Sequence, residues 1–279
     1  MDPHSSRRYL LAMGVQLWRL RQSHPEELEA GCAGEDGVQA SSPSASPVEA
    51  VPAAVDAVSG FGADIASQPR GGPAMAAGAG DAVADMDWDR LQEAVAACRA
   101  CSLCETRTQT VFGVGNRRAD LMIIGEAPGA DEDRQGEPFV GRAGQLLNLM
   151  LGAIGLKRDQ VYIANILKCR PPGNRDPRPE EALRCERFLM RQIALIRPRV
   201  LLSVGRISAQ NLLKTDAPIG KLRGRWFELG PERAPLSVTY HPAYLLRSPE
   251  QKGRVWRDLL EVARRLREPV GGVGTRSER

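Results

Sequence analysis

Four short segments rich in apolar residues constrain this chain more than any other feature. Each is four or five residues long, which is typical of a strand that is covered on both faces. The segments between them carry apolar residues at helical spacing. The runs lie at residues 121–124, 161–164, 200–204 and 236–239, and the helices are predicted at 87–98, 143–154, 179–196, 206–213 and 249–266. Strands that alternate with helices predict an α/β fold, a three-layer α/β/α sandwich around a central, mainly parallel four-stranded sheet.

The first third of the chain has a different composition. Residues 31–84 are dominated by Ala, Gly, Pro and Ser and contain few large apolar side chains. Such a segment buries too little surface to offset the entropy of ordering it, so we expect a disordered linker. The predicted organisation is a short amphipathic segment (1–24), a linker (25–84), a catalytic domain (85–268) and a disordered tail (269–279).

The first 24 residues resemble an export signal only superficially. Arg7 and Arg8 precede a short apolar run, but Gln16, Trp18 and Arg19 interrupt it. We therefore predict an amphipathic helix over residues 6–21, a candidate docking segment for a protein partner, in a cytoplasmic protein. The sequence contains nothing close to the ~20 apolar residues of a membrane span, so no membrane association is expected.

Charge changes at the same boundary as composition. Residues 1–84 carry 5 Arg and 10 acidic residues, whereas residues 85–279 carry 33 basic and 24 acidic residues. A basic domain suits a polyanionic partner such as nucleic acid, because Lys and Arg contacts to phosphate dominate that affinity. An ordinary solvated surface explains the same balance equally well.

Informative residues follow each predicted strand. The first strand leads into the loop 125–129, and the others are followed by Asn165, Gly205 and His241. Ligands of parallel sheets bind beyond the carboxyl ends of the strands, so these residues are expected to line one pocket. His241 is the only histidine in residues 85–279, and its place after a strand makes it a catalytic candidate.

Four of the six cysteines form two pairs. Cys98 and Cys101 are separated by two residues, and Cys169 and Cys185 by fifteen. Cys104 extends the first pair, but the ferredoxin pattern then needs a cysteine at position 108, which is Thr. The cysteines are either buried free thiols or metal ligands, and the CxxC spacing favours ligands. Spacing alone leaves zinc and iron–sulfur both open.

Several longer motifs resemble the family 4 uracil-DNA glycosylases, the iron–sulfur branch of the uracil-DNA glycosylase superfamily. The resemblance covers residues 98–258. The matching stretches are Arg107-Thr-x-x-Val-Phe-Gly113, Gly125-Glu-Ala-Pro-Gly129, Pro138-Phe-Val-Gly141, Lys168-Cys-Arg-Pro-Pro-Gly-Asn-Arg-Asp-Pro177 and His241-Pro-Ala-Tyr-Leu-Leu-Arg247. The resemblance implies a uracil-DNA glycosylase-like fold and a monofunctional hydrolase that removes uracil from single- or double-stranded DNA. It also implies a structural 4Fe–4S cluster on Cys98, Cys101, Cys169 and Cys185, without Cys104.

The resemblance assigns roles in the pocket. Phe139 is expected to stack on a flipped uracil, beside Gly125 and Ala127. The Asn165 amide can accept from uracil N3–H and donate to O4, a polarity that cytosine reverses. His241 is expected to donate to uracil O2 as charge develops there. Taken alone, a core Phe and an Asn at a strand end are commoner roles for residues 139 and 165.

Two acidic residues and four candidate DNA contacts complete the predicted site. Glu126 and Glu132 are candidates for positioning water or stabilising the cationic sugar, and their roles are not divided here. Leu245 matches a position at which the superfamily inserts a wedge into DNA. The resemblance and the charge pattern predict DNA contacts from Leu245, Arg247, Lys168 and Arg170.

Two other functions compete with uracil excision. One is a catalytically silent, cluster-bearing DNA-binding module, and the other is a superfamily relative with an altered base range. The joint presence of Glu126, Phe139, Asn165 and His241 argues against the silent module. We expect the protein to be a monomer.

Overall fold

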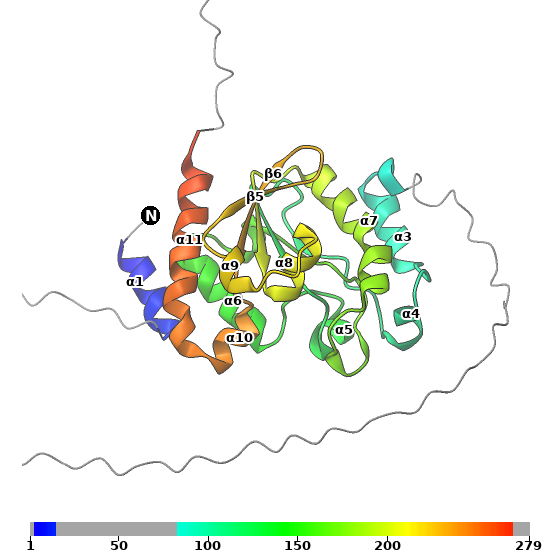
Figure 1. Cartoon of the computed structure of the whole chain (residues 1–279), viewed down its shortest axis with the longest axis horizontal. Coiled ribbons are helices and arrows are strands. Elements are labelled where there is room, and N and C mark those ends of the chain that lie inside the picture. Colours follow the sequence, from blue (N-terminus) through cyan, green and yellow to red (C-terminus); the bar gives the residue numbers. More distant parts are fainter. Residues whose placement is uncertain (1–2, 15–82, 270–279) are drawn as a thin grey trace, which may run out of the picture. The chain divides into compact units, whose positions relative to one another are not determined.

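One six-stranded sheet forms the centre of the structure. The computed structural model describes residues 3–14 and 83–269. In these residues the strand order is β1-β3-β2-β4-β6-β5, and the ribbon view in Figure 1 shows helices on both sides of the sheet. The strands are β1 (Val114–Gly115), β2 (Leu121–Gly125), β3 (Tyr162–Asn165), β4 (Val200–Val204), β5 (Trp226–Leu229) and β6 (Ala234–Thr239).

The four strands predicted from sequence are the four central strands. The pairs β2–β3, β2–β4 and β4–β6 are all parallel, which confirms the predicted α/β class. The sheet has six strands and not the predicted four, because β1 and β5 add antiparallel edges. Sequence patterns missed both for a physical reason: β1 has two residues, and β5 alternates between exposed and half-buried residues without an apolar run.

The helices agree closely with the predicted ranges. The helix α7 has Pro at its first position, and Glu181 three residues after the N-cap accepts a hydrogen bond from the Arg178 N–H at 2.8 Å. The predicted helix 249–266 divides into a 3₁₀ turn and α11. The helices are α1 (Pro3–Ala12), α3 (Trp88–Ala96), α4 (Leu103–Thr106), α5 (Ala130–Gln135), α6 (Arg142–Ala153), α7 (Pro179–Ile196), α8 (Arg206–Leu213), α9 (Ile219–Leu222), α10 (Pro242–Arg247) and α11 (Lys252–Arg267), with 3₁₀ turns at Arg158–Gln160, Pro172–Asn174 and Pro249–Gln251.

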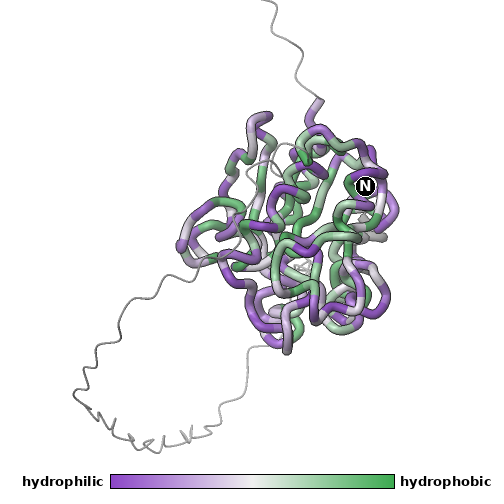
Figure 2. The backbone as a smooth tube through the Cα atoms, turned by 90° about the vertical axis from the view of Figure 1, so that its right-hand side faces the viewer, coloured by the Kyte–Doolittle hydropathy of each residue, from purple (hydrophilic) through white to green (hydrophobic). Residues whose placement is uncertain are grey.

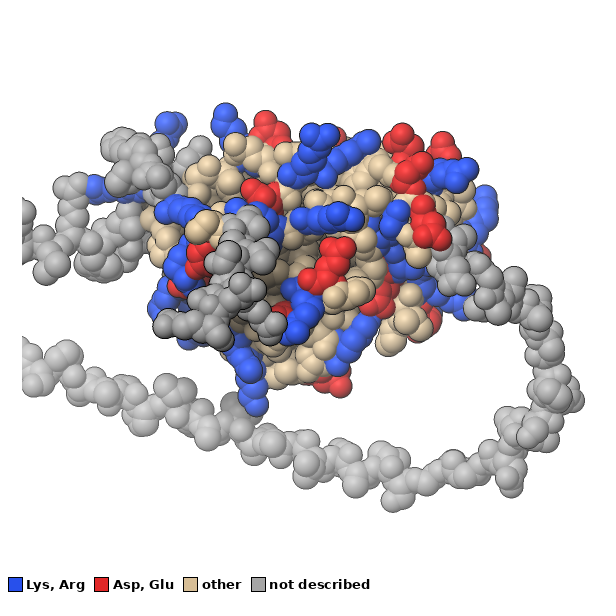
Figure 3. All heavy atoms as spheres, turned by 90° about the horizontal axis from the view of Figure 1, so that it is seen from above, with Lys and Arg blue, Asp and Glu red and all other residues tan. Residues whose placement is uncertain are grey.

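Hydropathy and charge are distributed as expected for a folded domain. Figure 2 shows that segments of hydrophobic residues lie mainly in the interior and that hydrophilic residues lie mainly on the outside. On the face drawn in Figure 3, Lys and Arg are interspersed with Asp and Glu, so the net positive charge does not form one uniform patch there. Among the described residues, no helix combines the length and the apolar character that crossing a membrane requires.

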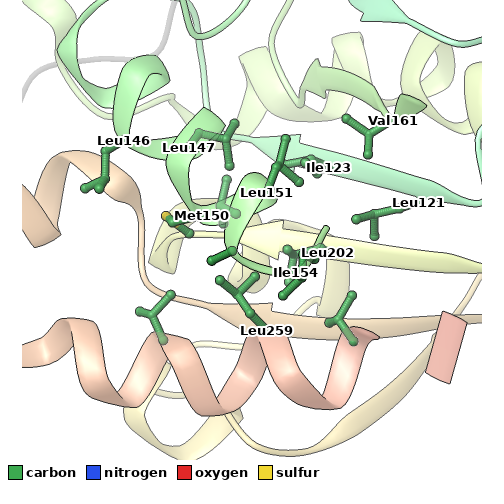
Figure 4. Packing of buried hydrophobic residues seen from close by; sticks show 14 of the residues in the cluster. Leu121, Ile123, Leu146, Leu147, Met150, Leu151, Ile154, Val161, Leu202 and Leu259 are labelled. Atoms are coloured by element: carbon green, nitrogen blue, oxygen red, sulfur yellow. The ribbon is translucent and has the colours of Figure 1, made fainter. Parts of the chain in front are cut away.

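The core consists of two layers, one on each face of the sheet. Alternate strand residues point to opposite faces. Ile123 and Leu202 pack against α6 and α11, whereas Ile124 and Leu201 pack against the layer that contains α7. Figure 4 shows the first layer, in which α6 contributes Leu146, Leu147, Met150 and Leu151, and Ile154 follows directly after the helix.

The N-terminal helix α1 belongs to the same compact unit as the sheet. It packs on α6, and its Leu10, together with Met13 just beyond the helix, is buried in the first core layer. The helix spans Pro3–Ala12, so it begins before the predicted start at residue 6, and residues 15–21 of the predicted range lie outside the described residues. The predicted linker and tail lie almost wholly outside the described residues, because residues 15–82 and 270–279 are not described.

Candidate active site

One pocket lies at the carboxyl ends of the parallel strands. Gly125 ends β2, Asn165 ends β3, and His241 follows β6. The register pairs Gly125 with Asn165, so the two residues are direct neighbours. As predicted from their place after strands, Asn165 and His241 line the same pocket. The pocket is also lined by Glu126, Ala127, Pro128, Gly129, Glu132, Phe139, Ala143, Pro171, Asn174, Arg175, Asp176, Ala243, Tyr244 and Arg247.

Asn165 carries the most informative polar group in the pocket. The residue is only 2% exposed, and its Oδ1 has no hydrogen-bond partner within the protein. A buried carboxamide oxygen without a partner costs about 1–3 kcal/mol, so this atom is suited to a ligand donor. Gly125 makes the space for it, because a Cβ there would lie 2.3 Å from Oδ1 and 2.7 Å from Phe139 Cε2.

Phe139 is held in an unusual backbone conformation. Its φ is +55°, in the left-handed region that residues other than glycine rarely adopt. Its ring stacks on the His241 ring, with centroids 5.5 Å apart and planes inclined by 28°. Gly144 in α6 permits this loop, since a Cβ on Gly144 would lie 1.8 Å from the Phe139 carbonyl oxygen.

Two charged side chains hold the Phe139 loop through hydrogen bonds to its backbone. Glu132 Oε1 accepts from the N–H groups of Val140 (3.0 Å) and Gly141 (3.2 Å), and Oε2 accepts from Gly129 N–H (3.1 Å). Arg158 donates to the carbonyl oxygens of Pro138 (2.5 Å) and Phe139 (3.3 Å). Sequence patterns did not single out Arg158, because it follows the loop by nineteen residues.

Replacing Glu132 by Ala is expected to destabilise the fold through this loop. The change removes the acceptor of three backbone N–H groups, so we expect the free energy of unfolding to fall by about 2–4 kcal/mol. Chemical denaturation measures this, with Glu232→Ala at an exposed position as the control. Equal stability of the two variants would contradict the role of Glu132 in holding the loop.

His241 is oriented by its own helix. It caps α10, and its Nδ1 accepts a hydrogen bond from Ala243 N–H at 3.1 Å. In the neutral ring the proton is therefore on Nε2, which is left to donate. Burial, and then the positive charge of Arg247, lower the pKa of His241 to about 4. Gly205 allows this close packing, because a Cβ there would lie 3.1 Å from His241 Cβ.

Glu126 follows β2 directly and lines the same pocket. Burial and the nearby carboxylate of Asp176 raise the pKa of Glu126 to about 7, against the opposing effect of Arg206. A carboxyl group with a pKa near neutral pH can act in either protonation state. The structure thus separates the two predicted acids, since Glu132 is engaged by backbone N–H groups and Glu126 is not.

Two of the residues predicted to contact DNA are buried in this structure. Leu245 is 1% exposed and packs in the first core layer, whereas its neighbour Leu246 is 38% exposed. Lys168 is also 1% exposed, and its Nζ donates to Asn165 O and Gln192 Oε1, so it cannot reach a phosphate. The sequence motif contains both residues but does not indicate which way each points.

The other two residues predicted to contact DNA are at least partly exposed. Arg247 is exposed at the pocket, and Arg170 is half-buried with its Nε donating to Asn174 Oδ1 at 2.7 Å. Their contacts with DNA stay a prediction.

The predicted cysteines converge on a second, separate pocket. Cys98, Cys101, Cys169 and Cys185 line it together with Cys104. Two sulfur atoms accept hydrogen bonds: Cys169 Sγ from Arg107 Nη1 at 2.9 Å, and Cys185 Sγ from the Lys168 N–H at 3.3 Å. Across the described residues, no group of His, Cys, Asp or Glu is arranged to hold a single metal ion. Thiols of this kind are, when deprotonated, the ligands of both zinc and iron–sulfur centres.

Comparisons with known proteins identify the family of this chain. A family model described as the uracil DNA glycosylase superfamily matches residues 112–260. The type-4 uracil-DNA glycosylase of Archaeoglobus fulgidus is 43% identical over 180 residues, which is 62% of this chain and 90% of that protein. Its namesake in Pyrobaculum aerophilum is 40% identical over 180 residues, 62% of this chain and 92% of that protein. In Thermotoga maritima the identity is 42% over 160 residues, 57% of this chain and 82% of that protein. The chain therefore belongs to the type-4 uracil-DNA glycosylases of the uracil-DNA glycosylase superfamily.

Proposed function

We propose that this protein is a DNA repair enzyme that hydrolyses the N-glycosidic bond of uracil in DNA and leaves an abasic site. The observation that carries the proposal is the buried Asn165 amide, whose Oδ1 has no partner in the protein. It lies in one pocket with the Phe139 ring and the His241 imidazole. Family membership independently supports the same activity.

Base recognition follows from the Asn165 carboxamide. Uracil must leave the base stack before its glycosidic bond can be reached, so the pocket takes an extruded base. Phe139 offers a ring face for stacking. Asn165 Oδ1 accepts from uracil N3–H, and Nδ2 donates to O4. Cytosine has an acceptor at N3 and a donor at C4, so both contacts would be lost and would leave buried groups unpaired.

Bond cleavage depends on charge that appears on the leaving base. As the glycosidic bond breaks, negative charge develops on uracil O2, and the sugar gains oxocarbenium character. Nε2–H of neutral His241 is suited to donate to that oxygen. Ionised Glu126 is suited to orient the attacking water or to stabilise the cationic sugar. No nucleophilic lysine is needed, so the enzyme is proposed to be monofunctional.

The DNA contacts are proposed from exposure. Arg247 lines the pocket and Arg170 donates to Asn174, which also lines it, so both arginines are suited to contact phosphates. Leu246 replaces Leu245 as the candidate for filling the gap left by the extruded base, because Leu246 is the exposed leucine of α10. The single- or double-stranded preference stays open in this proposal.

We also propose that Cys98, Cys101, Cys169 and Cys185 hold a 4Fe–4S cluster. The fit rests on five thiols around one pocket and on two N–H donors aimed at their sulfur atoms. The bound cluster supplies structural cross-links between the α3–α4 segment, Cys169 and α7. A protein partner for residues 1–24, a monomeric state and a cytoplasmic location also stay predictions.

Release of uracil tests the proposed function directly. The substrate is an oligonucleotide with one uracil, and the readout is strand scission after alkali treatment. We expect scission by the cluster-loaded wild type and none of an oligonucleotide with cytosine at that position. A cluster-loaded protein that releases no uracil in any context would instead favour the silent DNA-binding module, and release of another base would indicate an altered base range.

The rate of uracil release should depend on the ionisation of Glu126. The ionised form increases as pH rises through about 7, so the single-turnover rate should fall about tenfold per pH unit well below that value. The Glu126→Gln variant should be slower and should lose this acidic limb. Glu232→Gln at an exposed position should keep it. An unchanged limb in Glu126→Gln would assign it to another group.

A further inference from the structure

Lys168 is a buried cation that the proposed reaction does not use. Its side chain is 1% exposed, which is rare for a lysine unless its charge is compensated. None of the ion pairs in the described part of the chain involves Lys168. Its location therefore calls for a physical explanation.

The segment that carries Lys168 connects the two pockets. Asn165, which is proposed to read the base, lies three residues before it, and Cys169 follows it directly. The intervening backbone is hydrogen-bonded to the loop 125–129. Ile166 N–H donates to Gly125 O, and Leu167 N–H donates to Glu126 O, both at 3.0 Å. The distance along the chain between recognition residue and cysteine ligand is only four residues.

The Lys168 ammonium fixes the recognition end of this segment. Nζ donates to the Asn165 carbonyl oxygen at 3.0 Å and to Gln192 Oε1 at 2.6 Å. Gln192 is itself fully buried and donates through Nε2 to Phe112 O at 2.9 Å and to Tyr162 OH at 3.2 Å. The Asn165 backbone is thus anchored through Lys168 to α7 and to the loop before β1.

The same residue contacts the cysteine end. Lys168 lines the cysteine pocket, and its backbone N–H donates to Cys185 Sγ at 3.3 Å. Cys185 and Cys169 line this pocket together with Lys168, and a cysteine binds a metal as the negatively charged thiolate. Thiolates that bind iron would therefore supply the negative charge that compensates the buried Lys168 ammonium.

We propose that Lys168 is a positioning residue that couples the cysteine pocket to the base pocket, by holding the Asn165 backbone and by compensating thiolate charge. The first role, holding the Asn165 backbone, is the recognition half of this inference, and it rests on the proposed uracil excision. The second role, compensating thiolate charge, is the charge half, and it depends only on the cysteines.

The charge half is tested by cluster content. Lys168→Met retains the length of the stem and removes the ammonium, and Lys221→Met at an exposed position is the matched control. We expect purified Lys168→Met to contain less than half of the wild-type iron and visible absorption per protein, and Lys221→Met to equal wild type. Wild-type iron content and wild-type resistance to a chelator in Lys168→Met would overturn this half.

The recognition half is tested by a double-mutant cycle with Asn165→Ala. For cluster-loaded protein, Lys168→Met should lower kcat/KM by about 10- to 100-fold, the equivalent of one hydrogen bond to a charged group. In the Asn165→Ala background the same change should cost less than about twofold, because the side chain that it positions is gone. A merely structural lysine would reduce kcat/KM equally in both backgrounds, and that result, like an unchanged kcat/KM, would overturn the proposal.

A second variant decides the question if Lys168→Met does not fold. Gln192→Leu retains the lysine but removes the acceptor at 2.6 Å that aims it, and the same cycle with Asn165→Ala applies. Coupling supports the inference, and equal losses overturn it. If wild type releases no uracil, the proposed function fails, whereas iron content still decides the charge half.

Discussion

Asn165→Ala is expected to lower kcat/KM for uracil release by about 1000-fold without loss of the fold. The side chain makes two proposed hydrogen bonds to the base, each worth about 1–3 kcal/mol when the unmade bond leaves a buried group unpaired. Two such losses of about 2 kcal/mol each correspond to roughly three powers of ten. The folded state itself loses little, because Oδ1 has no partner in the protein.

The measurement is single-turnover uracil release, accompanied by iron content and thermal unfolding. Asn148→Ala, an exposed asparagine on α6, is the matched control and should retain wild-type kinetics. If Asn165→Ala keeps iron and stability and still releases uracil at more than a tenth of the wild-type rate, base recognition lies elsewhere in the pocket.

His241→Ala is the second change with a large expected effect. Removal of one donor to a developing oxyanion typically costs 100- to 1000-fold in kcat, and we expect a loss of that order with KM changed less. His241→Gln retains a side-chain N–H donor and should recover part of the rate. Equal rates for the Ala and Gln variants would exclude hydrogen-bond donation as the role of this residue.

The protonation state of His241 gives an independent check. Burial and Arg247 lower the pKa to about 4, so the ring is neutral at pH 7 and stays neutral until pH approaches 4. Because the pKa is lower in the folded state than in the unfolded state, the associated stability is lost as pH falls from about 6.5 towards 4. Nuclear magnetic resonance should show the His241 ring signal, assigned by its absence in His241→Ala, without titration between pH 5 and 8. A midpoint near 6.5 would contradict the neutral donor.

This pH behaviour separates the two ionisable groups of the pocket. The acidic limb near pH 7 is assigned to Glu126, whose pKa burial and Asp176 raise to about 7. In Glu126→Gln the rate should therefore be level down to about pH 5, since His241 is still neutral there. A residual limb near pH 6.5 in that variant would indicate that the imidazole titrates in the pH range of activity.

The sequence by itself determined the sheet centre and the location of the pocket. Buried strands need continuous apolar runs, and parallel strands present their carboxyl ends at one edge. The residues that follow those strands could therefore be predicted to lie close together, and Asn165 and His241 do line one pocket. The cysteines were readable from their spacing, although the choice of cluster and ligand set came from family resemblance.

Only the tertiary structure decided which way individual side chains point. Lys168 and Leu245 lie in motifs suited to DNA contact, yet both are buried, because the strand end and α10 turn them inward. The Arg158 contacts to the Phe139 loop join residues nineteen and twenty positions apart, and no local pattern encodes such a pairing. The edge strands β1 and β5 were not predicted, because β1 has only two residues and β5 alternates between exposed and half-buried residues. Periodicity reports how much of a segment is buried, but side-chain direction in irregular segments depends on what packs against them.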